Sequence, residues 1–445
     1  MRFRPTAVFV SLLFATVAAP TIAQTSAPSA SSVPSAALDP AARKAIVTQL
    51  ATELRNRYVY PDLGEKGAAA ITAAAAAGAY DRFTDLPSFA RRLTDDLHGV
   101  LHDGHLAVFV ARDGPGLSIA SIPPDEAGII RAGRLAGGIA YLEIAGFANP
   151  WAFKPALDRA MAGLKGSRAL ILDVRGNHGG DPAAVSYLVS YLLPAGKRIE
   201  INRIVWRKAG TTDVTRKAFF SEPTPVSFAG LPVYVLIGGH TFSGGEELAY
   251  DIQTLKLGTL VGETTGGGAN PGQAVAVGHN VMALIPTGRA ESPVTGSNWE
   301  GRGVQPDIAV PDADALAAAL RRLGRSPAAA TIEAASPAPK FTPRTVPLKG
   351  SKAMLRRLLA GRAAPEPDYT LLAADTGEPG RAAFAAAHRR LQPLGDPQAI
   401  HFRRPDGFGF DEFTLVYPDR TLLVAIELDR AGKFRGLLGP DKASP

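Results

Sequence analysis

The spacing of apolar residues changes along the chain and separates regions of different type. Between residues 39 and 100, apolar side chains recur every three or four residues, as they do on one face of an amphipathic helix. Two such stripes consist of Ile46, Leu50, Leu54 and Tyr58, and of Phe89, Leu93 and Leu97. The pattern predicts a small N-terminal helical domain over residues 39–110.

From residue 137 onward, short apolar runs alternate with amphipathic stretches. The runs IAYLEI, ALILDV, PVYVLI and TLVG suit strands that are buried on both faces, and the stretches between them have helical spacing. Strands that alternate with helices imply right-handed crossovers and a layered α/β domain. We assign this domain to residues 111–318.

The last part of the chain follows a third pattern. Residues 319–348 are rich in Pro and Ala and predict a linker. Residues 349–445 begin with helical spacing and end with apolar residues at every second position around turn-forming residues, which is typical of antiparallel strands. They predict a small α+β accessory domain.

The amino terminus resembles an export signal. Arg2 and Arg4 precede an apolar stretch that ends in small residues, so residues 1–23 predict a signal peptide. A membrane anchor is the alternative, but the stretch is shorter than the roughly 20 apolar residues that an anchor needs. The Ser-, Ala- and Pro-rich residues 24–38 predict a disordered tether. The chain has no cysteine, which excludes disulfides and a thiol nucleophile, and we expect a periplasmic location in a Gram-negative bacterium.

The net charge of +7 comes from an excess of basic residues after position 320. Such a segment could bind an anionic surface, but no aromatic residues accompany the charge in 321–362, apart from Phe341. A solvated linker and helix face is the favoured interpretation. We expect no nucleic acid partner and no membrane-spanning segment once the signal is removed; the pattern leaves the oligomeric state open.

The stretch GGHTFSGGEELAY places Ser243 between an apolar run and a predicted helix. Backbone N–H groups at a helix start lack intrahelical partners, so an oxyanion formed by attack of Ser243 on a carbonyl would meet the N–H of Gly244. The alternative is an ordinary helix N-cap, for which serine is common. On this stretch alone the two interpretations are equally favoured.

A second glycine-rich turn, DVRGNHGGD, also follows an apolar run and opens onto a helix. Two such turns at the carboxyl ends of parallel strands would lie close together, where Gly179 or Gly180 could supply a second oxyanion donor. A phosphate-binding loop is disfavoured because the Walker pattern is absent. Arg175 and Asp173 are interpreted as structural, with a substrate carboxylate as the alternative partner for Arg175.

A serine nucleophile needs a base, and His105 is the favoured candidate because it lies between a sharp turn and an apolar strand. A metal site using His98 and His102 is the main alternative. It is disfavoured because Gly99 and the following Asp-Gly turn are expected to interrupt the helix. A lysine base is disfavoured because Lys256 is thirteen residues beyond Ser243. No metal or other cofactor is expected.

A third residue should orient the base. Glu300, in GSNWEGRGVQPDI, is preferred because its segment is too irregular for a simple strand, although a surface-loop acid is the alternative. Glu246 and Asp103 are secondary candidates. Glu246 follows the nucleophile by one helical turn, where a carboxylate could simply complement the helix dipole.

Four motifs together resemble the tail-specific or C-terminal processing family of serine peptidases, which includes the tricorn protease core and the repeats of interphotoreceptor retinoid-binding protein. They are LHDGH at 101–105, LDVRGNHGG at 172–180, GGHTFSGGEELAYDIQTLKLGTLVGETTGGG at 238–268 and EGRGVQPDI at 300–308. The resemblance implies a crotonase-like layered β/α catalytic core, flanked here by the N-terminal helical and C-terminal α+β domains. The C-terminal part is itself only loosely similar to cystatin-like or NTF2-like domains.

The resemblance also assigns roles to residues. It implies that Ser243 is the nucleophile and that Gly244 and a glycine of GNHGG form the oxyanion hole. One branch of the family uses a lysine at the place that Gly268 occupies here, so this chain resembles the other branch, with His105 as base and Glu300 in support. Two departures stand out: the roughly 25 residues between HLAVFV and IAYLEI are too few for a peptide-binding module, and Gly104 replaces the serine that neighbours the tricorn histidine.

These features lead us to expect an exported serine peptidase with a peptide or protein substrate. The alternatives are a catalytically inactive protein that binds a retinoid, lipid or peptide on the same scaffold, and a hydrolase of another acyl compound.

Overall fold

The computed structural model of the protein describes residues 38–110, 127–327, 332–333, 346–373, 377–405, 411–428 and 432–442. The predicted signal peptide, residues 1–23, and all of the predicted tether except Leu38 lie outside these ranges. Among the described residues, no helix combines the length and the apolar character needed to cross a membrane.

Three helices form the N-terminal region: α1 (Pro40–Arg57), α2 (Pro61–Ala76) and α3 (Leu86–Leu101). Asp39 and Asp85 cap α1 and α3, since each side chain accepts a hydrogen bond from a backbone N–H of the first turn.

The expectation that Gly99 interrupts the third helix is wrong. Helix α3 continues through Gly99 to Leu101 and ends at His102, whose φ of 53° is left-handed. A helical glycine costs only about 1 kcal/mol relative to alanine. Burial of the apolar stripe of α3 outweighs this cost.

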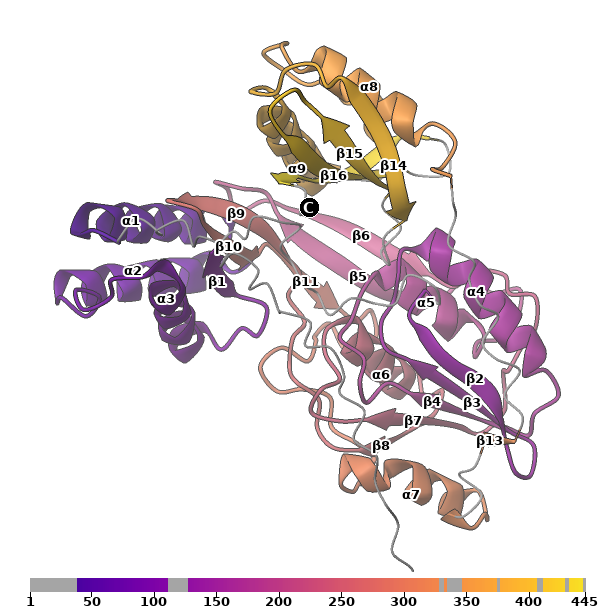
Figure 1. The fold of residues 1–445 in the computed structure, drawn as a ribbon. Coiled ribbons are helices and arrows are strands. Elements are labelled where there is room, and N and C mark those ends of the chain that lie inside the picture. Colours follow the sequence, from indigo (N-terminus) through magenta and orange to yellow (C-terminus); the bar gives the residue numbers. More distant parts are fainter. Residues whose placement is uncertain are drawn as a thin grey trace, which may run out of the picture. The chain divides into compact units, whose positions relative to one another are not determined.

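A three-stranded antiparallel sheet completes the core of the helical region. Its strands are β1 (Ala107–Val110), β10 (Val281–Pro286) and β9 (Gly272–Gly278), in that order. Buried residues of β9 and β10 pack in one cluster with the helices, namely Val277, Val281, Ala283 and Ile285. Chain from the region predicted as the catalytic domain therefore supplies part of the N-terminal core (Figure 1).

The central sheet has seven strands in the order β12-β8-β7-β4-β3-β2-β13. Their bounds are β12 (Ile308–Ala309), β8 (Thr259–Gly262), β7 (Val233–Ile237), β4 (Ala169–Asp173), β3 (Ile139–Ile144), β2 (Ile129–Leu135) and β13 (Ile332–Glu333). The five strands β12, β8, β7, β4 and β3 pair with one another in parallel. The pairs β3–β2 and β2–β13 are antiparallel. The predicted α/β organisation is thus confirmed as a mixed α/β fold.

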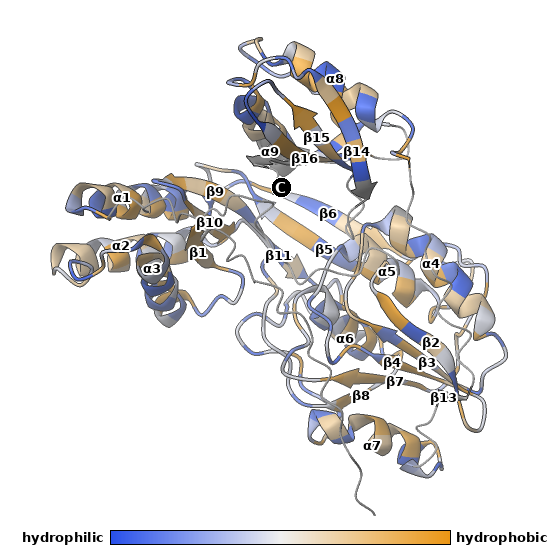
Figure 2. Ribbon diagram, in the orientation of Figure 1, coloured by the Kyte–Doolittle hydropathy of each residue, from blue (hydrophilic) through white to orange (hydrophobic). Residues whose placement is uncertain are grey.

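Helices cover both faces of this sheet. On one side Leu170 and Leu172 of β4 share a core with α4 (Pro150–Gly163), α5 (Pro182–Ser190) and α6 (Gly244–Thr254). On the other side Ala169 and Ile171 pack with α7 (Ala315–Arg322), which follows the short 3-10 helix Asp312–Asp314. Because successive strand residues point to opposite faces, both faces must be apolar, and Figure 2 shows orange along the central strands.

Two features of this region were not expected from the sequence. A separate antiparallel sheet contains β11 (Gly288–Glu291), β5 (Glu200–Arg207) and β6 (Val214–Phe220). In addition, the segment predicted as the linker, residues 319–348, begins inside α7 and contributes β13 to the edge of the central sheet.

The C-terminal region has its own apolar core. Strands β14 (Ala399–Pro405), β15 (Asp411–Val416), β16 (Thr421–Leu428) and β17 (Phe434–Lys442) form an antiparallel sheet in sequence order. Helices α8 (Ser351–Gly361) and α9 (Gly377–Leu391) pack against it, with a 3-10 turn at Tyr369–Leu371 between them. The period-two pattern predicted β15, β16 and β17, whereas β14 was not expected from the sequence.

Candidate active site

Ser243 lies at a strained turn between β7 and α6. Its φ of 52° and ψ of −118° are unusual for a residue with a side chain. Such a conformation costs on the order of 1–3 kcal/mol and persists only where neighbours hold it. Here the Phe242 N–H donates to the Asn177 carbonyl and the Ser243 N–H donates to Glu246, both at 2.9 Å.

The His105 side chain, from the segment just before β1, contacts Ser243. Its Nε2 lies 3.1 Å from the Ser243 hydroxyl oxygen, within hydrogen-bond distance. The imidazole also packs on the Phe242 ring, with 4.8 Å between ring centroids. Burial lowers the pKa of His105, and the nearby Asp103 carboxylate offsets part of this effect. A lowered pKa keeps the ring neutral near pH 7, as a base requires.

Two backbone amides close to Ser243 are available to an oxyanion. Within the described part of the chain, the N–H groups of Gly180 and Gly244 have no hydrogen-bond acceptor. A Cβ placed on Gly244 would lie 3.0 Å from the Gly180 nitrogen, so the two residues are in close contact. By contrast, the Gly179 N–H donates to the Asn177 side chain at 2.8 Å. Of the two predicted glycines, Gly180 is therefore the one with a free donor.

Gly179 has a different function, because it lets the chain pass close to the nucleophile. Its φ is +104°, and a Cβ there would lie 2.7 Å from the Cβ of Ser243. Carbon atoms of two side chains do not approach this closely, so a side chain at position 179 would displace Ser243. The neighbouring Asn177, which the sequence analysis did not single out, holds this turn by also donating to the Ile144 carbonyl.

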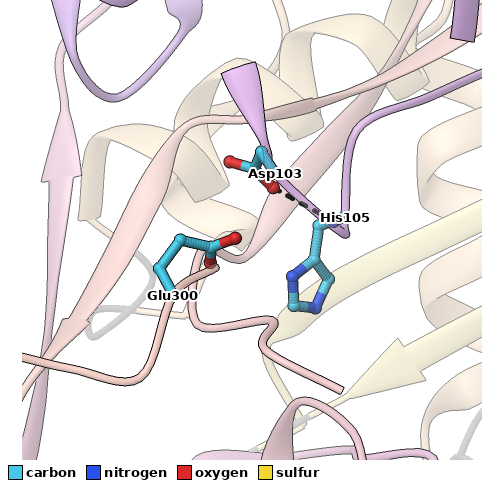
Figure 3. Close-up of side chains that lie close together, drawn as sticks. All are labelled: Asp103, His105 and Glu300. Carbon is cyan, nitrogen blue, oxygen red and sulfur yellow. Dashed lines mark hydrogen bonds between the residues drawn. The ribbon is translucent and has the colours of Figure 1, made fainter. Parts of the chain in front are cut away.

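Glu300 lies near His105 but makes no direct hydrogen bond to it. One Glu300 oxygen accepts from the Ala269 N–H, and the other accepts from the Gly104 N–H at 3.4 Å. Burial and the Asp103 charge raise the pKa of Glu300 to about 8. Figure 3 shows Glu300 and Asp103 beside the imidazole, and the three side chains bring ligand-type atoms within 4.8 Å of one another.

Asp103 is a buried carboxylate with donors on several sides. It accepts hydrogen bonds from the Tyr58 hydroxyl at 2.8 Å, the Asn270 amide at 2.9 Å and the His105 N–H at 3.0 Å. The sequence predicted Tyr58 only as a member of an apolar helical stripe, did not point to Asn270, and gave Asp103 as a secondary candidate.

Glu246 stabilises the backbone around the nucleophile. It is buried, and its two oxygens accept from the Ser243 N–H, the Thr265 hydroxyl and the N–H groups of Gly267 and Gly268. Burial raises the pKa of Glu246, whereas these donors oppose that rise. Glu246 therefore does more than complement the dipole of α6, because its hydrogen bonds join the turn before α6 to the loop at 265–268.

Comparisons with known proteins place these residues in a family. A family model described as peptidase family S41 matches residues 138–310, and a model for the N-terminal domain of peptidase S41 in eukaryotic IRBP matches residues 39–130. Together the two matches cover more than half of the chain. The chain belongs to peptidase family S41.

Several solved structures are similar at low identity. The photosystem II D1 C-terminal processing protease is 21% identical, with a TM-score of 0.33 over 47% of this chain and 49% of its own, so this chain spans about half of its length. A putative peptidase from Parabacteroides merdae is 20% identical, with a TM-score of 0.45 over 64% of this chain and 93% of its own. The tricorn protease is 20% identical, with a TM-score of 0.26 over 43% of this chain and 17% of its own.

The surroundings of Gly268 bear on the lysine that the resemblance places at this position in one branch of the family. A Cβ on Gly268 would lie 2.2 Å from Phe242 Cζ and 2.9 Å from His105 Cε1. A side chain at this position is incompatible with the present places of Phe242 and His105. The absence of a lysine here therefore has a steric reason, since the imidazole and the phenyl ring fill the space.

The other candidate residues have structural partners in this S41 chain. His98 Nε2 lies 2.6 Å from the Leu106 carbonyl oxygen, so the proposed helical metal pair would have to give up this contact. Arg175 forms a two-pronged ion pair with Asp173 and also donates to the Asp312 carbonyl at 2.7 Å. These bonds support the structural interpretation of Arg175.

Among the described residues, Asp103, His105 and Glu300 are the group of acidic and histidine side chains close enough to share a metal ion. Their carboxylate oxygens already accept bonds from Tyr58, Asn270 and three backbone N–H groups. The hydrogen bonding favours an acid-base cluster.

Proposed function

We propose that the protein is an exported serine peptidase that hydrolyses peptide bonds with Ser243 as nucleophile and His105 as general base. The observation that carries this proposal is the 3.1 Å separation between His105 Nε2 and the Ser243 hydroxyl at a strained turn. An activated nucleophile requires a base within hydrogen-bond reach, and membership of family S41 gives the chemistry its class.

In this mechanism the Ser243 oxygen attacks the substrate carbonyl carbon while its proton passes to His105 Nε2. The N–H groups of Gly244 and Gly180 stabilise the oxyanion of the tetrahedral intermediate. The protonated imidazole then donates to the leaving amine as the C–N bond breaks, which yields an acyl-enzyme on Ser243. Water, deprotonated by His105, releases the acid product and restores the hydroxyl.

The acidic residues support the base. Glu300 is the predicted third member; it lies beside the imidazole and accepts hydrogen bonds from the backbone N–H groups of Gly104 and Ala269. Glu246 holds the Ser243 backbone and does not face the reacting atoms in this scheme.

Export, a crotonase-like core and a periplasmic location are parts of the same proposal. Export and location are supported by the charged and apolar pattern of residues 1–23. The crotonase-like description is supported by the parallel βα units of the central sheet and by the family membership.

Labelling with a fluorophosphonate probe tests the nucleophile directly. We expect mass spectrometry to find the probe on Ser243, and we expect Ser243→Ala to abolish labelling and peptide hydrolysis while the thermal transition remains. Ser88→Ala, an exposed serine on α3, is the matched control and should leave both signals intact. A Ser243→Ala protein that still hydrolyses peptides would refute the mechanism.

A ligand-binding protein on the same scaffold is the alternative function. The match of residues 39–130 to a domain of eukaryotic IRBP is the observation that favours it. In that case the folded wild-type protein would show no probe labelling and would instead bind a retinoid, lipid or peptide tightly.

A further inference from the structure

The carboxylate of Asp103 connects three parts of the site that are distant in sequence. The Tyr58 hydroxyl comes from the end of α1, the Asn270 amide comes from the loop after Gly268, and the third donor is the backbone N–H of His105 itself. Asp103 is only 1% exposed. In all three contacts the carboxyl group is the acceptor, which is the hydrogen-bonding pattern of a carboxylate.

Glu300 faces a less favourable set of neighbours. It accepts hydrogen bonds from two backbone N–H groups, one of them at 3.4 Å, and the neighbouring charges that raise its pKa are those of Asp103 and Glu246. Two carboxyl groups this close do not readily ionise together. The raised pKa of Glu300, about 8, follows from its burial and from the Asp103 charge.

The two ring nitrogens of His105 have different surroundings. Nε2 contacts Ser243, whereas Nδ1 is buried and, among the described residues, has no hydrogen-bond partner. Figure 3 shows a ring nitrogen turned toward the two carboxyl groups. The Coulombic effect acting on the His105 pKa comes from Asp103.

We propose that Asp103 is the charged positioning residue of His105, and that Glu300 holds the proton of the Asp103–Glu300 pair in the resting protein. Asp103 fixes the loop that carries the base through the His105 N–H and supplies the negative charge that stabilises the imidazolium. Glu300 acts as a neutral acid that fills the cluster and bonds the loops at Gly104 and Ala269. This inference rests on the proposed hydrolytic function and reverses the expected ranking of the two acids.

Isosteric amide variants separate the two acids. Gln resembles a protonated Glu, so we expect Glu300→Gln to lower kcat by no more than about 10-fold at pH 7. Asp103→Asn removes the charge of Asp103 and should lower kcat by about 100-fold or more, within the usual range for general acid–base catalysis. KM should change little in either variant. Asp95→Asn, an exposed residue of α3, is the matched control for an Asp-to-Asn change.

The pH profile gives a readout that a purely structural role would not change. Asp103 raises the pKa of His105, so its neutralisation should move the acid limb of kcat/KM to lower pH, by about 1 pH unit for a charge in close contact. Glu300→Gln should shift this limb less.

Imidazole NMR makes the test independent of activity. The His105 resonance, identified by its loss in His105→Gln, should titrate at lower pH in Asp103→Asn and should move less in Glu300→Gln. Wild-type protein that neither hydrolyses peptides nor takes up probe refutes the proposed function, and the NMR titration then still decides the present inference.

Two results would overturn the proposal. One is a loss of 100-fold or more in Glu300→Gln at pH 7, which decides the matter even if Asp103→Asn does not fold. The other is a folded Asp103→Asn protein with wild-type kcat and an unshifted His105 titration.

Discussion

At the scale of single residues, glycine determines where the reacting groups can lie. Gly179 allows the Ser243 turn to approach, Gly180 and Gly244 offer amides that have no acceptor within the described ranges, and Gly268 leaves room for two rings. At each of these glycines a Cβ atom would come too close to a neighbouring atom. The chemistry of the site therefore depends as much on missing side chains as on the polar groups present.

A methyl group on Gly268 should disturb the base. In Gly268→Ala the new Cβ overlaps Phe242 and approaches His105, so we expect the imidazole to move away from Ser243. A displacement of about 1 Å can cost roughly 100-fold in rate, and the probe-labelling rate should fall accordingly. Gly99→Ala is the control, because a Cβ on Gly99 meets nothing within 4 Å. Unchanged labelling in Gly268→Ala would contradict the steric argument.

The pKa of His105 sets the acid limit of activity. The base must be neutral to accept the Ser243 proton, and burial holds its pKa below the ordinary value. Activity should therefore persist below about pH 6.5, the ordinary midpoint of a histidine, and decline only at lower pH. The labelling rate measured across pH 4–8 checks this expectation; an acid limb above the ordinary midpoint would show that the base is not desolvated.

At the scale of secondary-structure elements, the start of α6 is held by a buried side chain. Glu246 bonds the Ser243 N–H and three donors of the 265–268 loop, so one carboxylate fixes both the nucleophile and the loop next to His105. Unpaired donors in a buried place are costly, which explains why an acidic side chain is kept there.

Replacing this carboxylate should destabilise the protein. In Glu246→Gln an amide NH₂ would face N–H donors, and we expect a loss of about 1–3 kcal/mol in the free energy of unfolding. Urea denaturation measures it. The exposed Glu65→Gln serves as the matched control and should change the transition little. Equal midpoints for the two variants would contradict the structural importance of Glu246.

At the scale of the whole molecule, the regions differ in how they obtain their cores. The N-terminal helices share their core with β9 and β10, which follow some 160 residues or more later in the chain. The C-terminal strands and helices share a core of their own.

This difference predicts contrasting behaviour of fragments. A fragment of residues 346–445 should fold alone and show a cooperative thermal transition in far-UV circular dichroism, because its apolar cluster is complete. A fragment of residues 38–110 should show little cooperative structure, since Val277, Val281, Ala283 and Ile285 would be missing from its core. A stable helical fragment 38–110 would show that the strands are dispensable.

Local patterns in the sequence determined the helices, the buried strands and the chemical types in the site. The spacing of apolar residues located α1, α3, β4, β7 and α6, because this spacing depends on neighbours within a few residues. The glycine-rich turns, Ser243, His105 and Glu300 were identifiable as candidates for the same reason.

Contacts between distant segments were decided only by the tertiary structure. Residues far apart in sequence meet in the pairing of β1 with β10, in the donors around Asp103 and in the contacts that bury Glu246. The choice between Gly179 and Gly180 as oxyanion donor depends on exact backbone geometry. Hydrophobic burial is not directional, so a sequence pattern shows which residues are buried but not which partners they meet. The hydrogen-bond partners of buried polar groups follow from that packing and could not be predicted before it.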